Sequence, residues 1–519
     1  MRMYDVMTVK AALERSERWY AAETALVEGG VSVTYAAFGS ACRRIAAGFC
    51  KLGATKGDRI AFLCNAGITH TCAYYAGQLL GAISVNLHYR ESLVHQIQLL
   101  QRLQPSILVF DEEKEAIALE LGRVIRGLAL VRVGGAAGDI PIVDDFMRED
   151  EFSGNVSVTA SDPALIQLSS GSTGAPKALV HSHESVMHSW AGGVYMWNGI
   201  SATDRFLNGF APSFAVWVVH PGTFLSNGAA VVFSRAWDPV NYMRLVQDHN
   251  ITAAALTPTQ WRGILAADPE HYDLSSLRMA AYLGEKISPH HLKALTERVC
   301  STFCSFYGMS ECLGIGGCVI RSPDCIAKGK WGSIGKPTLN SDLRVIATGG
   351  SACDGLPVME AGDIVVRAAS FASDNWGDPS WKERVLTSDG WYRTGDVGYV
   401  DEDGFVFLTG RADNMIATGG IKVAAEEIEA ILVQNPHIAD VTVVGMLDHK
   451  WGERIVAFAV VRGGDVSPED LDRWCREDGR LAGFKRPKEW HLVEELPQNS
   501  VGKKDRQATK LMRKHQAVS

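Results

Sequence analysis

The chain has 519 residues, of which 46% are hydrophobic and 21% charged, and its formal net charge at pH 7 is −8. We expect more than one domain, because a single hydrophobic core rarely grows beyond about 250–300 residues. The acidic balance argues against nucleic acid as the main partner, since phosphate backbones are bound by basic surfaces. No stretch approaches the about 20 apolar residues of a membrane span, and the charged N-terminal segment is unlike a signal peptide.

Eleven cysteines are spread along the chain. Their densest group contains no C-x-x-C pair, so we expect free thiols rather than a zinc site; it comprises Cys300, Cys304, Cys312, Cys318 and Cys325. Buried free thiols indicate a reducing compartment, and therefore the cytoplasm.

The first 160 residues alternate between strand-like and helical patterns. Residues 33–35 predict a short strand, and an amphipathic helix follows and ends at Gly53. A second helix is expected over residues 73–81 and a second strand over 82–86. Alternation at this spacing predicts a parallel sheet covered by helices.

Residues 168–183 read LSSGSTGAPKALVHSH and have the composition of a phosphate-binding loop. Small residues let the backbone turn tightly so that successive N–H groups converge on an anion, and the hydroxyls add further donors. Lys177 adds a mobile positive charge. The loop is not a Walker A motif, and a flexible Ser/Gly linker is the alternative. The candidate anion-binding residues are Ser169, Ser170, Gly171, Ser172, Thr173, Gly174 and Lys177.

A second alternating block follows this loop. Its expected strands cover residues 229–233, 251–256, 279–283 and 302–305, with a helix over 241–249. From about residue 331 the pattern changes to short strands and turns. The last block, residues 413–519, reads as compact and helix-rich, with a helix over 426–434 and strands over 440–445 and 455–462.

The loop resembles the phosphate-binding signature of the adenylate-forming superfamily, which contains acyl-CoA synthetases, peptide-synthetase adenylation domains and luciferases. The resemblance covers nearly the whole chain; Ala178 departs from it, because the family usually has Gly there. It implies an α/β fold: a large N-terminal domain, residues 1–412, of helix-covered, mainly parallel sheets with a small β-barrel-like part, and a small mobile α+β C-terminal domain, residues 413–519. Asp413 would be the hinge between them.

The resemblance also assigns nucleotide-binding roles. Residues 307–311, YGMSE, match the family's Y-G-x-[ST]-E, so that Tyr307 would stack on adenine, while Glu311 and Thr173 would hold Mg²⁺. Asp396, in WYRTGD, would accept hydrogen bonds from both ribose hydroxyls, and Arg411 would contact the same ribose. Ordinary turns are the alternative in each case. The neighbouring nucleotide-binding positions are Gly284, Glu285, Gly308, Met309 and Ser310.

Two C-terminal segments complete the resemblance. Lys503, at the end of LPQNSVGK, would bridge the acyl carboxylate and the α-phosphate; a solvated basic tail is the alternative. Gly419 and Gly420, followed by Lys422, would leave room for the pantetheine arm of coenzyme A; a hairpin turn is the alternative.

The implied activity is that of an ATP-dependent acid–CoA ligase that uses Mg²⁺. A stand-alone adenylation enzyme that loads a carrier protein and a non-catalytic nucleotide-binding relative remain open, and a homodimer is compatible with the sequence. The acyl pocket would be lined by Phe210, Phe214, Ala215, Trp217 and Trp261.

The residue at position 215 bears on the acid. Amino-acid-activating relatives have an Asp there, whereas Ala215 cannot pair with a substrate ammonium, whose burial without a counter-charge costs several kcal/mol. Flat aromatic walls suit a ring or a short branched chain. We therefore expect an aromatic or compact apolar carboxylic acid. Of the nearby histidines, His181 is expected at the surface and His183 at one wall of the site, while residues 290–291 would begin an exposed helix.

Overall fold

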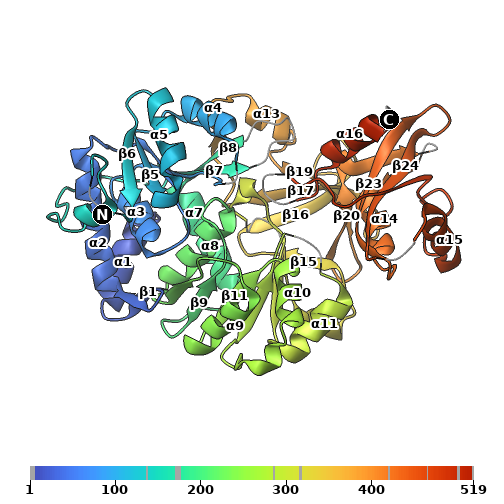
Figure 1. Ribbon diagram of the computed structural model, residues 1–519, viewed down its shortest axis with the longest axis horizontal. Helices are drawn as coiled ribbons and strands as arrows, with labels where there is room; N and C mark the ends of the chain where they lie inside the picture. The colour runs from blue at the N-terminus through green and yellow to red at the C-terminus, as the bar shows by residue number, and fades with distance from the viewer. Residues whose placement is uncertain are drawn as a thin grey trace. The chain divides into compact units, whose positions relative to one another are not determined.

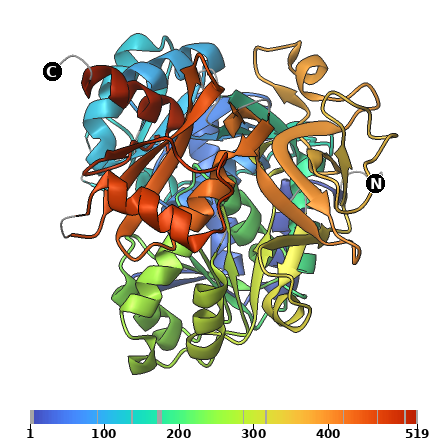
Figure 2. The ribbon, with the colours of Figure 1, turned by 90° about the vertical axis from the view of Figure 1, so that its right-hand side faces the viewer.

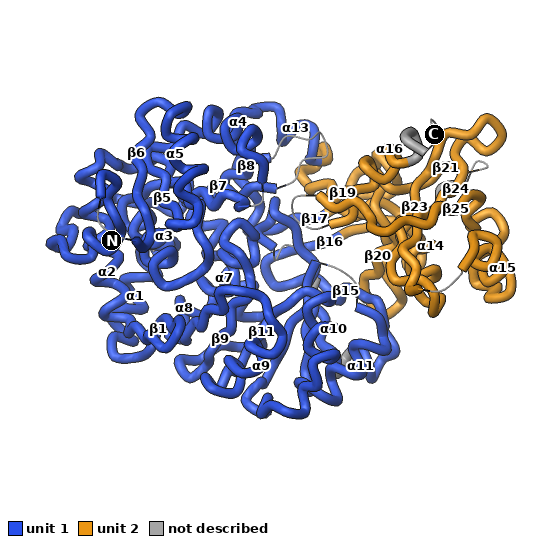
Figure 3. The backbone as a smooth tube through the Cα atoms, in the orientation of Figure 1, with its two compact units in different colours: residues 1–343, 366–386 blue, residues 344–365, 387–519 orange. Residues whose placement is uncertain are grey.

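A computed structural model describes residues 6–89, 91–135, 138–169, 177–284, 287–314, 318–418, 421–463, 466–499 and 503–516. The chain divides into two compact units (Figure 3): residues 1–343 with 366–386, and residues 344–365 with 387–519. Strands and helices alternate along the chain, which confirms the predicted α/β class. Among the described residues, no helix combines the length and apolarity needed to cross a membrane.

The first unit contains a seven-stranded sheet that carries the phosphate-loop segment. Its central strands are parallel, and β8 and β18 are added antiparallel at one edge. The order is β18 (Asp374–Asn375), β8 (Lys177–Ser182), β7 (Pro163–Ser169), β4 (Ile83–Asn86), β3 (Arg59–Leu63), β5 (Ile107–Asp111) and β6 (Ala129–Val133). The helices that alternate with these strands are α2 (Tyr35–Lys51), α3 (Ile68–Leu79), α4 (Leu93–Leu103) and α5 (Glu115–Val124).

A second run of strands in this unit is parallel at its centre, from β1 to β13, with antiparallel strands at both ends. Its order is β2 (Val31–Thr34), β1 (Thr24–Glu28), β10 (Ala230–Phe233), β9 (Arg205–Asn208), β11 (Ala253–Leu256), β12 (Met279–Tyr282), β13 (Phe303–Phe306), β14 (Cys318–Arg321) and β15 (Ser333–Pro337). The predicted strands of this block are confirmed, with ends shifted by one or two residues.

Helices lie on both faces of this second sheet (Figure 1). An apolar core fills each side, and β11 shows how the side chains divide between the two cores. Side chains alternate along a strand, so Ala253 and Ala255 face one core while Ala254 and Leu256 face the other. The first core contains residues of α1 (Val9–Tyr20), α2, α3, α7 (His183–Met196) and α8 (Ala215–Leu225). The second contains residues of α9 (Pro239–Asp248), α10 (Pro258–Ala266) and α11 (Pro289–Arg298).

The second unit contains two groups of strands. The first group consists of four neighbouring strands: β16 (Ser341–Ile346), β17 (Gly362–Ala368), β19 (Tyr392–Val400) and β20 (Val406–Arg411). The second (Figure 2) is a sheet of β21 (Met415–Thr418), β22 (Ile421–Ala424), β23 (Ile438–Asp448), β24 (Gly452–Val461) and β25 (Glu489–Leu492).

Three helices cover this last sheet. One face meets α14 (Ala425–Leu432) and α15 (Pro468–Asp478), and the other meets α16 (Arg506–Gln516). Residues 413–519 therefore contain long strands as well as helices. We predicted a helix-rich block, so the strand content is higher than predicted. The residues that join β23 to β24 are only 449–451, so the two strands form one long hairpin.

Candidate functional site

Strands β7 and β8 flank the predicted phosphate loop. They pair antiparallel, and Ser169 lies opposite Lys177 at the end of the ladder. Ser170, Gly171, Ser172, Thr173 and Gly174 lie outside the described residues. At the base of the loop, the buried Ser169 Oγ has no hydrogen-bond partner among the described residues, so this polar atom is available to a ligand.

Lys177 and Glu311 form an ion pair. Lys177 Nζ lies 2.9 Å from Glu311 Oε1, although 134 residues separate them in sequence. Glu311 belongs to the 3₁₀ turn Ser310–Cys312 that follows β13, and it is only 7% exposed. A buried carboxylate requires a counter-charge, and a half-exposed lysine supplies one that can move. The pair therefore joins a hard oxygen ligand to a mobile cation, which suits Mg²⁺ and phosphate respectively.

His181 is buried, so the prediction that it lies at the surface is wrong. Its ring lies between Ser185, whose Oγ is 3.3 Å from Nδ1, and the Ser310 carbonyl. Burial lowers the pKa of His181 to about 4, so the ring is neutral. Its Nε2–H donates to the Ser310 carbonyl oxygen at 3.1 Å, because a carbonyl can only accept. His181 thus anchors the turn that carries Glu311, a role the sequence analysis missed.

The strand period could have indicated this role. Residues 177 and 181 are four apart in one strand, so their side chains share a face of the sheet. The same face presents the lysine that pairs with Glu311 and the histidine that holds the neighbouring carbonyl. The role of His181 could not be recognised from this period alone, because only the fold shows that residues 310–311 lie opposite that face of β8.

The other predicted histidines have structural contacts. His183 is fully buried at the start of α7, and its Nδ1 accepts a hydrogen bond from the Val9 backbone N–H at 3.3 Å. It therefore ties the start of α1 to α7; the predicted place at a wall of the site stays a prediction. Residues 290–291 lie in the first turn of α11, with His290 exposed, as expected.

The predicted adenine-binding residues lie at the ends of neighbouring parallel strands. Gly284 follows β12, and Tyr307 to Ser310 follow β13, which pairs with β12 in parallel. In open α/β sheets, ligands bind outside the carboxyl ends of the strands. Tyr307 is 9% exposed; Glu285 lies outside the described residues. Gly308 and Met309 complete the segment between the strand and the Glu311 turn.

In the second unit, Asp396 and Arg411 lie opposite each other on β19 and β20. Arg411 Nη1 donates to Asp396 Oδ1 at 2.9 Å, and the Asp396 side chain is 15% exposed. Gly395 makes the contact possible, because a Cβ there would lie 2.8 Å from Arg411 Nη2 and its φ is +75°. A carboxylate that accepts one hydrogen bond from a guanidinium keeps lone pairs that can accept from hydroxyl groups.

The segment around Lys503 is anchored by its basic neighbours. Lys504 pairs with Asp440 at 2.7 Å, and Arg506 pairs with Glu429 at 2.7 Å. Lys503 itself is exposed, and only its backbone N–H and carbonyl are held, by Asn499. The basic residues at this end are therefore not one solvated tail, since two of them fix the segment that presents Lys503.

The remaining C-terminal candidates lie near this sheet's first hairpin. Strands β21 and β22 are antiparallel with Thr418 opposite Ile421, so residues 419–420 join them. Gly419 and Gly420 lie outside the described residues, as does the side chain of Lys422. Asp413 lies in the 3₁₀ turn Ala412–Asn414 that precedes β21. Its role as a hinge stays a prediction.

Four of the five predicted acyl-pocket residues are near one another in sequence, and three of them, Phe210, Phe214 and Trp217, belong to the first core or pack against it. Phe210 is 8% and Trp217 2% exposed, Phe214 contacts His88 edge-on, and Ala215 begins α8. Trp261 is separated from them. It belongs to the core on the opposite face of the sheet, where its Nε1–H donates to the Ala281 carbonyl at 2.8 Å.

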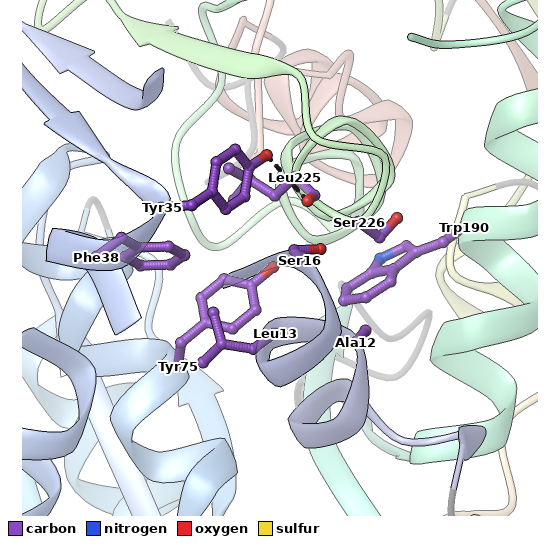
Figure 4. A pocket seen from close by; sticks show the side chains of 9 residues that line it. All are labelled: Ala12, Leu13, Ser16, Tyr35, Phe38, Tyr75, Trp190, Leu225 and Ser226. Atoms are coloured by element: carbon purple, nitrogen blue, oxygen red, sulfur yellow. Dashed lines mark hydrogen bonds between the residues drawn. The ribbon is translucent and has the colours of Figure 1, made fainter. Parts of the chain in front are cut away.

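A small apolar cavity lies elsewhere in the first unit (Figure 4). It is lined by residues of α1, α2, α3, α7 and α8, among them Ser16, Tyr35 and Trp190. Its volume of about 10 Å³ holds at most one water, so it is not a site for an organic acid.

Comparison with known families gives two matches. The model of the AMP-binding enzyme family matches residues 13–374, and the model of the AMP-binding enzyme C-terminal domain matches residues 427–503. Lys177 and Glu311 fall in the first match and Lys503 ends the second, while Asp396 and Arg411 lie between the two matches.

The relatives are acid–CoA ligases. An indoleacetate–CoA ligase of Aromatoleum aromaticum is 31% identical over 491 residues, 91% of each chain. A feruloyl-CoA synthase of Amycolatopsis sp is 30% identical over 488 residues, 92% of this chain and 94% of the relative. Among solved structures, the o-succinylbenzoate CoA synthetase of Bacillus subtilis in complex with ATP and magnesium ion has a TM-score of 0.85 at 23% identity, covering 96% of this chain and 99% of that one.

Proposed function

Because the chain belongs to the family of AMP-binding enzymes, we propose that it is an ATP-dependent acid–CoA ligase. The observation that carries the proposal is the Lys177–Glu311 ion pair beneath the phosphate-loop segment, since it joins a metal-binding oxygen to a phosphate-binding cation in one contact. Curated relatives with ligase names match along more than nine-tenths of the chain.

The reaction has two steps. A carboxylate oxygen of the acid attacks the α-phosphorus of ATP, and the bond from that phosphorus to the oxygen bridging to the β-phosphate breaks. Pyrophosphate is released, and the product that stays bound is an acyl-adenylate. The coenzyme A thiolate then attacks the acyl carbon, and AMP leaves with the electron pair of the acyl–oxygen bond. Activation is required because a free carboxylate is a poor electrophile. The acyl group stays on the nucleotide between the steps, so no side chain of the enzyme is acylated.

The first unit supplies phosphate and metal contacts in this proposal. Ser169, with the loop residues up to Gly174, donates to the phosphates, and Lys177 leaves Glu311 to neutralise phosphate charge. Glu311 and Thr173 hold Mg²⁺, which when bound screens the charge of the triphosphate. His181 keeps the Glu311 turn in place through the Ser310 carbonyl. Tyr307 and its neighbours receive the adenine ring.

The second unit supplies ribose and carboxylate contacts. Asp396 accepts from the ribose hydroxyls, and Arg411 orients that carboxylate. Lys503 stabilises the negative charge shared by the acid and the α-phosphate in the first step. A rotation at Asp413 then allows the predicted C-terminal domain, residues 413–519, to present Gly419, Gly420 and Lys422 to coenzyme A in the second step.

The acid is aromatic or compact and apolar in this proposal. Phe210, Phe214, Ala215 and Trp217 supply apolar surface around the start of α8, and position 215 offers no carboxylate for a substrate ammonium. Trp261 is left out of this pocket because its indole is directed into the other core.

The test is acid-dependent pyrophosphate release from Mg·ATP across aromatic, branched, medium-chain and long-chain acids and free amino acids. Aryl or compact acids should release pyrophosphate at the highest kcat/KM. Coenzyme A should then turn the adenylate into a thioester, detected by mass spectrometry. Release of pyrophosphate without thioester formation would instead support a carrier-protein acceptor, and binding of ATP without pyrophosphate release would support a non-catalytic relative.

The proposal also includes a cellular compartment and an oligomeric state. A cytoplasmic location fits the ten described cysteines, all of which are free thiols. A homodimer is a further prediction, which light scattering of the purified chain tests directly.

A further inference from the structure

His220 is a buried histidine on α8 with one satisfied ring nitrogen. The side chain is fully buried, and its Nδ1 accepts a hydrogen bond from the indole Nε1–H of Trp197 at 3.4 Å. An indole nitrogen can only donate, so Nδ1 carries no hydrogen.

The other ring nitrogen is therefore a donor. Burial lowers the pKa of His220 to about 3, so the ring is neutral and its one hydrogen sits on Nε2. Among the described residues, Nε2 has no hydrogen-bond partner. A buried donor without a partner costs about 1–3 kcal/mol, which makes such a group unusual in a well-packed core.

This donor lies beside the proposed acyl pocket. Phe306, which immediately precedes Tyr307, has its ring centroid 5.4 Å from that of His220, and Phe210 is 6.5 Å away. On the same helix, Val216 and Val219 come within 3.9 Å of the Cβ position of Gly314, just after the Glu311 turn. The face of α8 that bears His220 thus meets the segments at the ends of β9 and β13.

The surroundings of the ring are aromatic. Besides Phe306 and Phe210, His220 contacts Phe206 and Trp197, at centroid distances of 5.5 and 5.6 Å. Phe206 is the second residue of β9 (Arg205–Asn208), and Phe210 follows the end of that strand. The Nε2–H is therefore a polar group surrounded by aromatic rings.

We propose that His220 is a specificity-determining residue whose Nε2–H donates to an acceptor on the distal end of the acid. The proposal rests on the ligase function and narrows its substrate class to aryl or compact acids that carry a hydroxyl or carbonyl oxygen opposite the carboxylate. An acid without that oxygen leaves the donor unpaired, so discrimination by about 1–3 kcal/mol corresponds to roughly 5- to 150-fold in kcat/KM.

The experiment compares acids of nearly equal shape. The probes are 4-hydroxybenzoate with 4-methylbenzoate, 4-hydroxycinnamate with 4-methylcinnamate, and 4-hydroxyphenylacetate with 4-methylphenylacetate, assayed by pyrophosphate release. The wild-type chain should prefer the hydroxyl member of its best pair by at least fivefold. His220→Phe, which keeps an aromatic ring, should abolish that preference while the KM for ATP stays unchanged.

Trp197→Phe is the second variant. It leaves His220 in place but removes the N–H that holds Nδ1 as an acceptor, so the preference should shrink without disappearing. If a variant does not fold, competition binding of each pair to the wild-type chain still measures the preference.

The outcomes separate this inference from the ligase function. Pyrophosphate release with the methyl acids but no hydroxyl preference would overturn the role of His220 and leave the ligase function standing. An unchanged preference in a folded His220→Phe would mean that another group recognises the hydroxyl, and would also overturn it. No pyrophosphate release with any acid would overturn both.

Discussion

Mild acid should unfold this protein because it buries neutral histidines. His70, His181, His183 and His220 are each at most 2% exposed. Burial lowers their pKa, to about 4 for the first three and to about 3 for His220. In the unfolded chain each would titrate near pH 6.5.

The direction of the pH effect on stability follows from proton binding. Between pH 6.5 and about 4 the unfolded state binds more protons than the folded state, so the free energy of unfolding falls as the pH falls. At pH 5.5 each of these histidines contributes a loss of about 1.4 kcal/mol relative to pH 8, and the set about 5–6 kcal/mol. Typical unfolding free energies are about 5–15 kcal/mol, so this loss is decisive.

Two carboxyl groups act in the opposite direction. Burial raises the pKa of Asp111 and of Glu429, so their folded forms bind protons more readily than their unfolded forms. Their contribution rises as the pH falls through their raised folded pKa toward their unfolded range near 4, so it offsets part of the histidine loss at the acid end of that window. The steepest loss of stability should therefore lie between pH 6.5 and 5.

The assay is denaturant unfolding followed by tryptophan fluorescence at pH 7.5, 6.5 and 5.5. His220→Phe should flatten the pH dependence by about a quarter, while His290→Gln, at an exposed position, should leave it unchanged. A free energy of unfolding that stays constant between pH 7.5 and 5.5 would refute the reasoning.

Four substitutions test the proposed site. Lys503→Ala should abolish adenylation but spare thioester formation from supplied acyl-adenylate, whereas equal loss of both half-reactions would contradict its role. Asp413→Pro should separate the half-reactions by holding one orientation of the predicted C-terminal domain, residues 413–519, and unchanged turnover would mean that position 413 is not a hinge. Gly395→Ala should raise the KM for ATP, because its Cβ displaces Arg411, and should cost about 1–3 kcal/mol of stability at φ +75°; an unchanged KM would remove Arg411 from the ribose site. Trp217→Ala should shift the preference toward larger acids and lower stability by about 3–5 kcal/mol, because the ring packs on His70 and Tyr74; an unchanged acid preference would mean that Trp217 is only core.

Local patterns in the sequence determined the elements and the candidate motifs. Strand and helix types depend on the side-chain period, which a short window contains, so β10, β12 and α9 could be predicted to within two residues. The residues of the Lys177–Glu311 and Asp396–Arg411 pairs were also identified from sequence, although 134 residues separate the first pair. Each motif could be recognised in the sequence by itself, whereas the contact between the two residues of each pair could not.

Tertiary structure decided which side chains meet. The buried His181 contacts Ser310, which lies 129 residues later in the chain, and no local pattern encodes that contact. Trp217 and Trp261 are both aromatic residues near strand ends, yet they lie on opposite faces of one sheet. The donor state of His220 depends on Trp197, the residue that follows α7. Burial and hydrogen-bond partners arise from strand order and from the packing of distant segments, so they became visible only in the folded chain.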